Sequence, residues 1–298
     1  MKHKSLIPAL LLVLVLLCSC SSQQEYAPIA ATTLPVFEFT SRLCADTDLT
    51  VTRLVTESVS CLHDYSLNVR QVRAAEAAEL IVINGAHLEE FMEDLLEGKN
   101  CIDSSVGIEI LASEAGHSHE EEDVHHPQDG HNHELDNHIW LSPKNAMIMA
   151  QNICSGLCTR YPQYEDIFTD NLEDLLADLQ DLHAYGEAQL SQLSCRELIT
   201  FHDGFSYFAE SFDLHIVRAV EEESGAEASA AELIELIEEV RHHDLPAIFI
   251  ETNGSDSAAS VISRETGAAV HILDMAMSGY SYFDAMYHNI NTLKEALG

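Results

Sequence analysis

Four side chains that can bind a transition metal stand next to stretches that predict regular structure. They are His63, His138, His202 and Asp274. His202 and Asp274 lie at the ends of the predicted strands 197–201 and 269–273, and ligands of open α/β sheets bind at the carboxyl ends of strands. Three neutral imidazoles and one carboxylate form a four-coordinate set that Zn²⁺ accepts. We therefore expect one site, between two domains, that collects all four ligands.

Each of these residues is weak evidence when it is taken alone. His63 lies beyond a β-rich stretch, and His138 lies where a polar segment gives way to helical sequence. Asp274 could instead cap the segment that follows it. Asp284 is a competing carboxylate, although only Asp274 directly follows an apolar strand. The hypothesis therefore rests on the four residues taken together. Another carboxylate or a water molecule is an alternative to Asp274 as the fourth ligand.

Residues 113–134 form a second collection of metal-binding side chains, in a polar segment without periodicity that predicts a loop. Its histidines are His117, His119, His125, His126, His131 and His133. Acidic residues are interleaved with them, so the segment offers many weak and labile ligands. We expect an accessory site that raises the local metal concentration. The alternative is an acidic, solvated loop whose histidines do little.

The predicted elements on either side of this loop alternate between strand and helix. The expected strands are 49–56, 80–83, 106–111, 197–201, 216–220, 247–251 and 269–273. The expected helices are 68–78, 88–97, 229–243, 257–266 and 283–297. Between the two alternating regions, residues 143–193 are helical throughout, with leucines spaced three and four apart. Alternation of this kind predicts parallel sheets, so the fold class is α/β in two parts with a long helix between them.

The N-terminus reads as a signal for export and lipid attachment. Lys2 and Lys4 precede a short apolar run that suits a signal-peptide core and is too short to span a bilayer comfortably. The run ends at Cys20, in a context that resembles a bacterial lipoprotein cleavage box. We expect a signal peptide over 1–19, lipid on Cys20 and a tether over 20–26. The alternative is an ordinary signal peptide that is cleaved elsewhere.

Charge and cysteine content exclude some classes of function. With 14 Lys+Arg against 50 Asp+Glu, the formal charge is −36, and too few cations are present to bind nucleic acid phosphates. Six cysteines remain after Cys18 and Cys20, and sequence alone cannot choose among their pairings. They are Cys44, Cys61, Cys101, Cys154, Cys158 and Cys195. No C-x-x-C pair occurs, which argues against a thiolate zinc site.

Several segments together resemble the zinc and manganese substrate-binding lipoproteins of bacterial ABC transporters, the cluster A-I solute-binding proteins. The matching segments are 78–89, 136–143, 201–209, 225–233 and 248–251. Asp136-x-His138-x-Trp140 is similar to the family's second-histidine motif, and Phe201-His202-Asp203 to its third. The loop at 113–134 resembles the histidine-rich loop of the zinc-specific members. The resemblance covers nearly the whole chain beyond the signal peptide.

This resemblance implies both an architecture and a function. Two Rossmann-like lobes would be joined by a long rigid linking helix, with the metal between the lobes. Its ligands would be His63, His138, His202 and Asp274. We expect an N-terminal lobe over 27–142, linking helices over 143–194 and a C-terminal lobe over 195–298. The chain would be a monomer, anchored outside the cytoplasm on the bacterial cell membrane. It would capture a divalent metal with high affinity and deliver it to an ABC transporter permease.

Zinc is favoured as the cargo, and other functions remain as alternatives. Imidazole suits Zn²⁺, whereas Mn²⁺ prefers oxygen-rich sites of higher coordination, so a manganese-specific member is the first alternative. The second is a surface adhesin or metal sponge that uses only the loop at 113–134. The third is a zinc hydrolase with Glu251 or Asp203 as its base, although no H-E-x-x-H motif is present. We expect no enzymatic activity.

Overall fold

The computed structural model describes residues 26–57, 62, 65–112, 135–220, 229–252, 254 and 256–298. The expected signal peptide, the lipidation site Cys20, His63 and the six histidines of the loop at 113–134 lie outside these ranges. Within them, no helix is both long and apolar enough to cross a membrane.

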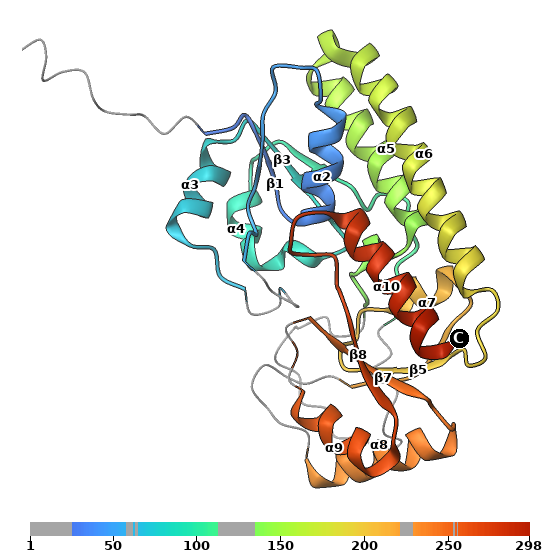
Figure 1. The fold of residues 1–298 in the computed structure, drawn as a ribbon. Coiled ribbons are helices and arrows are strands. Elements are labelled where there is room, and N and C mark those ends of the chain that lie inside the picture. Colours follow the sequence, from blue (N-terminus) through green and yellow to red (C-terminus); the bar gives the residue numbers. More distant parts are fainter. Residues whose placement is uncertain are drawn as a thin grey trace, which may run out of the picture.

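Two parallel four-stranded sheets form the two lobes (Figure 1). The N-terminal sheet contains β1 (Ile29–Ala31), β2 (Val51–Arg53), β3 (Leu80–Ile83) and β4 (Cys101–Asp103). The C-terminal sheet contains β5 (Glu197–Thr200), β6 (His215–Ala219), β7 (Ala247–Glu251) and β8 (Ala269–Leu273). The orders β2-β1-β3-β4 and β6-β5-β7-β8 are the same, because in each lobe the second strand lies outside the first and the third on its other side.

This strand order creates a switch point in each lobe, where the chain reverses its direction of travel across the sheet. It lies between β1 and β3 in the N-terminal lobe and between β5 and β7 in the C-terminal lobe. Ligands of open α/β sheets bind outside the carboxyl ends of strands at such points. The residues that follow β5 and β7 are therefore placed where a site is expected.

Helices cover both faces of each sheet (Figure 1). In the N-terminal lobe α2 (Leu34–Leu43) lies on one face, while α3 (Val69–Ala77) and α4 (Glu93–Leu96) lie on the other. In the C-terminal lobe α8 (Ala230–His242) and α9 (Ser257–Thr266) cover the outer face, and α7 (Ser206–Ser211) lies towards the N-terminal lobe. Strand β7 shows why both faces need cover: Ala247 and Phe249 pack into one core, Ile248 and Ile250 into the other.

The two lobes are joined by α5 (Pro143–Arg160), α6 (Glu165–Leu190) and α10 (Tyr282–Leu297). Helix α6 is about 39 Å long at 1.5 Å per residue and runs from the far end of the N-terminal lobe to the C-terminal sheet (Figure 1). Its buried side includes Leu175, Leu179 and Leu182, which belong to one hydrophobic core together with residues of both sheets. This shared core makes the connection a packed spine, and it confirms the predicted α/β fold with a long helix between two lobes.

Two predicted elements differ in the structure. Residues 106–111 form no strand, because Gly107 has a φ of +83° and the amide of Ile108 donates to the carbonyl of Ser105 at 2.9 Å, which makes a turn. The last strand of this sheet is β4 instead. The helix expected over 88–97 begins as the 3₁₀ turn η1 (Leu88–Met92) and continues as α4. A left-handed residue, His87, precedes it.

Candidate metal centre

His138 and His202 meet between the lobes, although 64 residues separate them in the chain. The two Nε2 atoms lie 3.3 Å apart, and the rings are nearly perpendicular at 88°. His138 precedes the buried 3₁₀ turn η3 (Ile139–Leu141), and His202 follows β5 at the switch point of the C-terminal sheet. The structure therefore brings together two of the four expected ligands, with the same ring nitrogen of each pointing at the other.

The ring of His138 is fixed from behind by a carboxylate. Its Nδ1 donates to Oδ1 of Asp136 at 2.9 Å, and its backbone N donates to the same oxygen at 2.9 Å. Both side chains are buried, with 5% of His138 and none of Asp136 exposed. Because an ionised carboxylate only accepts hydrogen bonds, the proton of the imidazole is on Nδ1 and the lone pair is on Nε2. Nε2 is the nitrogen that faces His202.

The ring of His202 has an acidic neighbour on its far side as well. Its Nδ1 lies 3.7 Å from Oε2 of Glu251, the last residue of β7, and both side chains are largely buried. Strands β5 and β7 are neighbours in the sheet, so their carboxyl ends place these two side chains together. Sequence patterns point to Glu251 only as a candidate base and give Asp136 no separate role. The two-residue spacing of Asp136 and His138, and the adjacent strand ends, are the signals that could identify these two supports.

Asp274 follows β8, the strand next to β7, and its backbone is held firmly. Its N donates to Oδ1 of Asn289 and its carbonyl accepts from Nδ2 of the same residue, both at 2.7 Å. Its own Oδ1 accepts from the amide of Ala276 at 2.8 Å. Among the described residues no group of three histidine, cysteine or acidic side chains is arranged to hold a metal, so Asp274 is not joined to the histidine pair.

The segment after Asp274 nevertheless packs against the segment of His138. Nε1 of Trp140 donates to the carbonyl of Met275 at 2.7 Å, and the indole lies beside the His138 ring, with 5.2 Å between the ring centroids. Gly204 completes this contact, because a Cβ there would lie 2.8 Å from Nδ1 of His138 and 2.7 Å from Cε of Met275. The glycine lets the loop after β5 approach the imidazole closely.

His63 lies outside the described residues, and only its surroundings can be placed. Leu62 is buried in the core shared by the lobes, and its carbonyl accepts from the amide of Tyr65 at 3.1 Å. The loop at 113–134 also lies outside, but its two ends meet. Ala112 and Leu135 form an antiparallel bridge, and the amide of Asp136 donates to the carbonyl of Leu111 at 2.9 Å.

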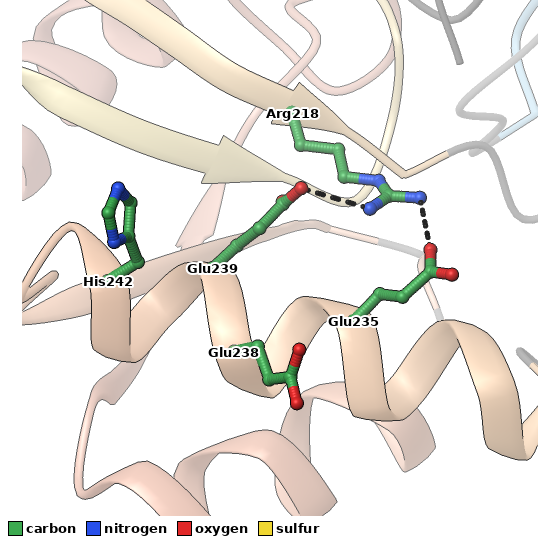
Figure 2. Close-up of a pocket in the computed structure, with 5 residues that line it drawn as sticks. All are labelled: Arg218, Glu235, Glu238, Glu239 and His242. Atoms are coloured by element: carbon green, nitrogen blue, oxygen red, sulfur yellow. Dashed lines mark hydrogen bonds and ion pairs between the residues drawn. The ribbon is translucent and has the colours of Figure 1, made fainter. Parts of the chain in front are cut away.

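A hollow of about 470 Å³ on the C-terminal lobe lies outside this centre. Figure 2 shows its lining on β6 and α8, and it includes none of the expected ligands. Arg218 bridges two of its acids, at 3.1 Å from Glu239 and 3.3 Å from Glu235. These ion pairs connect the edge strand β6 to its covering helix α8.

Over residues 29–296 the chain matches the protein family described as "ZnuA: Zinc-uptake complex component A periplasmic". It is 30% identical over 309 residues to "Zinc-binding lipoprotein AdcA" of Streptococcus pneumoniae (strain ATCC BAA-255 / R6), a match that covers 99% of this chain and 61% of that protein. It is 26% identical over 285 residues to "Zinc-binding protein AdcA" of Streptococcus pyogenes serotype M3, covering 89% of this chain and 55% of that protein. The chain thus spans little more than half the length of these relatives.

Two solved structures have the same fold. A crystal structure of ZnuA superposes with a TM-score of 0.78 at 27% identity, covering 92% of this chain and 100% of that one. The Zn(II)-bound ZnuA-like domain of Streptococcus pneumoniae AdcA superposes with a TM-score of 0.75 at 26% identity, covering 92% and 99%. The family match extends through both lobes and the helices that join them. The chain therefore belongs to the ZnuA family of zinc-uptake components.

Proposed function

We propose that this chain captures Zn²⁺ outside the cytoplasm and delivers it to an ABC transporter in the membrane. The separation of the two imidazole nitrogens carries the proposal. Two nitrogens bound to one tetrahedral zinc, each at about 2.0–2.1 Å from it, lie roughly 3.3–3.4 Å apart. The Nε2 atoms of His138 and His202 are 3.3 Å apart, so a zinc ion can bind both with little movement of either ring.

His63 and Asp274 are proposed to complete the coordination. Asp274 follows a strand of the same sheet as His202, and Met275 contacts the segment of His138, so the carboxylate is expected to turn towards the pair when the metal binds. His63 would enter from the N-terminal lobe. The result would be three imidazoles and one carboxylate, which satisfies the four-coordinate preference of zinc.

Zinc is preferred over manganese because of this donor set. Imidazole nitrogens bind Zn²⁺ more tightly than Mn²⁺, whose sites contain more oxygen. The relatives named as zinc-binding proteins support the same choice. The histidines at 113–134 are proposed to act as an accessory site at the entrance, since the ends of that segment are joined next to Asp136.

The N-terminal sequence and the family support a proposal for the location and the partner of the chain. Cleavage before Cys20 and lipid on its sulfur would anchor the chain, because acyl chains contribute about 0.8 kcal/mol per buried CH₂. The anchored chain, acting as a monomer, would present its zinc to the permease of an ABC transporter. The family description, a periplasmic component of a zinc-uptake complex, supports a location outside the cytoplasm and delivery to a transporter.

A calorimetric titration tests the proposal. The chain from Glu25 onwards, with residues 113–134 replaced by a short Asn-Gly turn between the paired Ala112 and Leu135, would be titrated with Zn²⁺ and Mn²⁺ in parallel. We expect one tight zinc site that His202→Ala abolishes. Tight binding of manganese with weak binding of zinc would leave capture intact with a different cargo. If neither metal binds tightly, the loop is the only binder and the sponge or adhesin function replaces capture.

Hydrolysis is the less suitable function for this geometry. A zinc hydrolase needs a base beside the open position of the metal. Glu251 faces Nδ1 of His202, on the opposite side of the ring from the nitrogen that meets His138. A carboxylate in that position supports a histidine ligand from behind, as outer-sphere carboxylates do in zinc sites.

A further inference from the structure

The carboxylate of Asp136 has an unusual environment for a fully buried acid. Its Oδ1 accepts two hydrogen bonds, both from His138, one from the backbone and one from the ring. Its Oδ2 is buried and has no hydrogen-bond partner among the described residues. No arginine or lysine forms an ion pair with it in the described part of the chain. A buried carboxylate without a balancing cation is costly, and such groups are retained where they have a use.

We infer that Asp136 is a positioning residue, which fixes the His138 ring with its Nε2 lone pair towards His202 and supplies the negative charge that favours a cation there. The inference rests on the proposed function and adds a residue to it. Orientation comes from the 2.9 Å hydrogen bond to Nδ1, which selects one tautomer and one ring rotation. The charge acts through the imidazole, because a metal on Nε2 makes the Nδ1 proton more acidic and strengthens that hydrogen bond.

Asp136 is itself held from the other lobe, by the hydroxyl of Tyr207 on α7. That hydroxyl donates to the carbonyl of Asp136 at 2.9 Å and accepts from the amide of Leu111 at 2.9 Å. The Tyr207 hydroxyl thus bonds to the backbone of both Leu111 and Asp136. These two residues are also joined directly, because the amide of Asp136 donates to the carbonyl of Leu111. Burial raises the pKa of Tyr207 to about 12, so the hydroxyl keeps its proton and continues to donate at physiological pH.

This arrangement links both histidines through one short segment. Tyr207 lies in the helix that follows the loop of His202, so the segment 202–207 carries one ligand and also holds the support of the other. The contact therefore ties the position of Asp136, and through it the ring of His138, to the same segment that carries His202.

Three variants separate the parts of this inference, in the protein with its histidine-rich segment intact. Asp136→Ala removes the hydrogen bond and the charge, Asp136→Asn removes the charge and keeps an acceptor oxygen, and Tyr207→Phe removes only the hydroxyl. We expect the zinc dissociation constant, measured by competition with a chromophoric chelator, to rise about 10–100-fold in Asp136→Ala. Smaller rises are expected in the other two variants. Asp174→Asn, which removes an exposed charge on α6, should bind as the wild type does.

A second measurement distinguishes positioning from a general loss of stability. Nitrogen-15 NMR of the zinc-free protein should show His138 with its proton on Nδ1, and Asp136→Ala should shift the ring to a mixture of tautomers. Unchanged zinc affinity in Asp136→Ala, or an unchanged His138 tautomer, would overturn the inference. Failure of the proposed function would give a different result. The wild type would then bind zinc no more tightly than His138→Ala, in which one of the proposed ligands is missing.

Discussion

Glu38 of the N-terminal lobe accepts a hydrogen bond from the backbone N of Tyr282, in the first turn of α10, at 2.6 Å. The hydroxyl of Ser281, the N-cap of that helix, lies 3.4 Å from the other carboxylate oxygen. A carboxylate on α2 therefore caps a helix that follows the C-terminal sheet. Helix N-termini favour negative charge, so the contact fastens the segment after Asp274 to the opposite lobe.

Replacement of Glu38 by alanine should weaken this fastening. The buried first turn of α10 would lose its acceptor, which typically costs about 1–3 kcal/mol when a donor is left unsatisfied. We expect the free energy of unfolding of the zinc-free protein, measured in urea at pH 7, to fall by about that amount. Glu90→Ala, at an exposed acid of the same lobe, is the control and should change stability by less than about 0.5 kcal/mol. Equal stability of both variants would show that the cap contributes nothing.

A side chain at position 204 should weaken the binding of zinc. A Cβ at this position would lie 2.8 Å from Nδ1 of His138 and 2.9 Å from its Cε1, which is closer than side chains tolerate. Because Asp136 holds that ring, the ring cannot move aside without losing its hydrogen bond. We expect Gly204→Ala to weaken zinc binding at least tenfold in calorimetry, with the fold retained by circular dichroism. Wild-type affinity in this variant would mean that His138 is not held in the position described.

The sequence predicts the C-terminal lobe well because its elements are bounded by strong local signals. Strand β7, helix α9 and strand β8 have the expected boundaries, and Ser229 caps α8 in a reciprocal pair with Glu232. The N-terminal lobe is predicted less completely. Strand β1 is only three residues long, and the turn at Gly107 interrupts an apolar run that resembles a strand.

The pairing of His138 with His202 is expected from the sequence, but local patterns alone cannot fix its geometry. Each residue lies next to an element of its own lobe, and only the packing of the lobes determines the distance between the rings. The spine of α5, α6 and α10 sets that distance through a core shared by both lobes. The supporting residues Asp136 and Tyr207 depend on the same packing, since their hydrogen bond crosses between the lobes.

The pH dependence of zinc binding should count the histidine ligands. Protons compete with the metal for the lone pair of every imidazole ligand, so the apparent affinity falls as the pH is lowered, and it falls more steeply with each further histidine ligand. We expect a steeper fall between pH 7 and pH 5 in the wild type than in His63→Ala if His63 joins the pair. Chelator competition at pH 7, 6 and 5 measures it, and full affinity at pH 5 would exclude a histidine site.

The buried carboxylate of Glu89 should make the free energy of unfolding depend on pH, independently of metal binding. Its carboxylate is buried and accepts from the hydroxyl of Thr32 and from the amides of Asn84 and Gly85. Burial raises the pKa of Glu89 from 4.5 to about 7, against the lowering effect of these hydrogen bonds, and Asp103 raises it further. Folding therefore favours the protonated form. The stability that this group contributes is fully present below about pH 4.5 and is lost as the pH rises through about 7.

The variant Glu89→Gln, which cannot ionise, isolates this effect. A shift of this size corresponds to roughly 3 kcal/mol, so the stability of the wild type relative to Glu89→Gln should fall by about that amount between pH 4.5 and pH 7.5. Urea unfolding with a chelator present measures the difference and cancels the histidines common to both proteins. Glu93→Gln, at an exposed acid nearby, should follow the wild type in parallel. If Glu89→Gln also runs parallel to the wild type, Glu89 is ionised throughout, and its three hydrogen bonds outweigh the cost of burial.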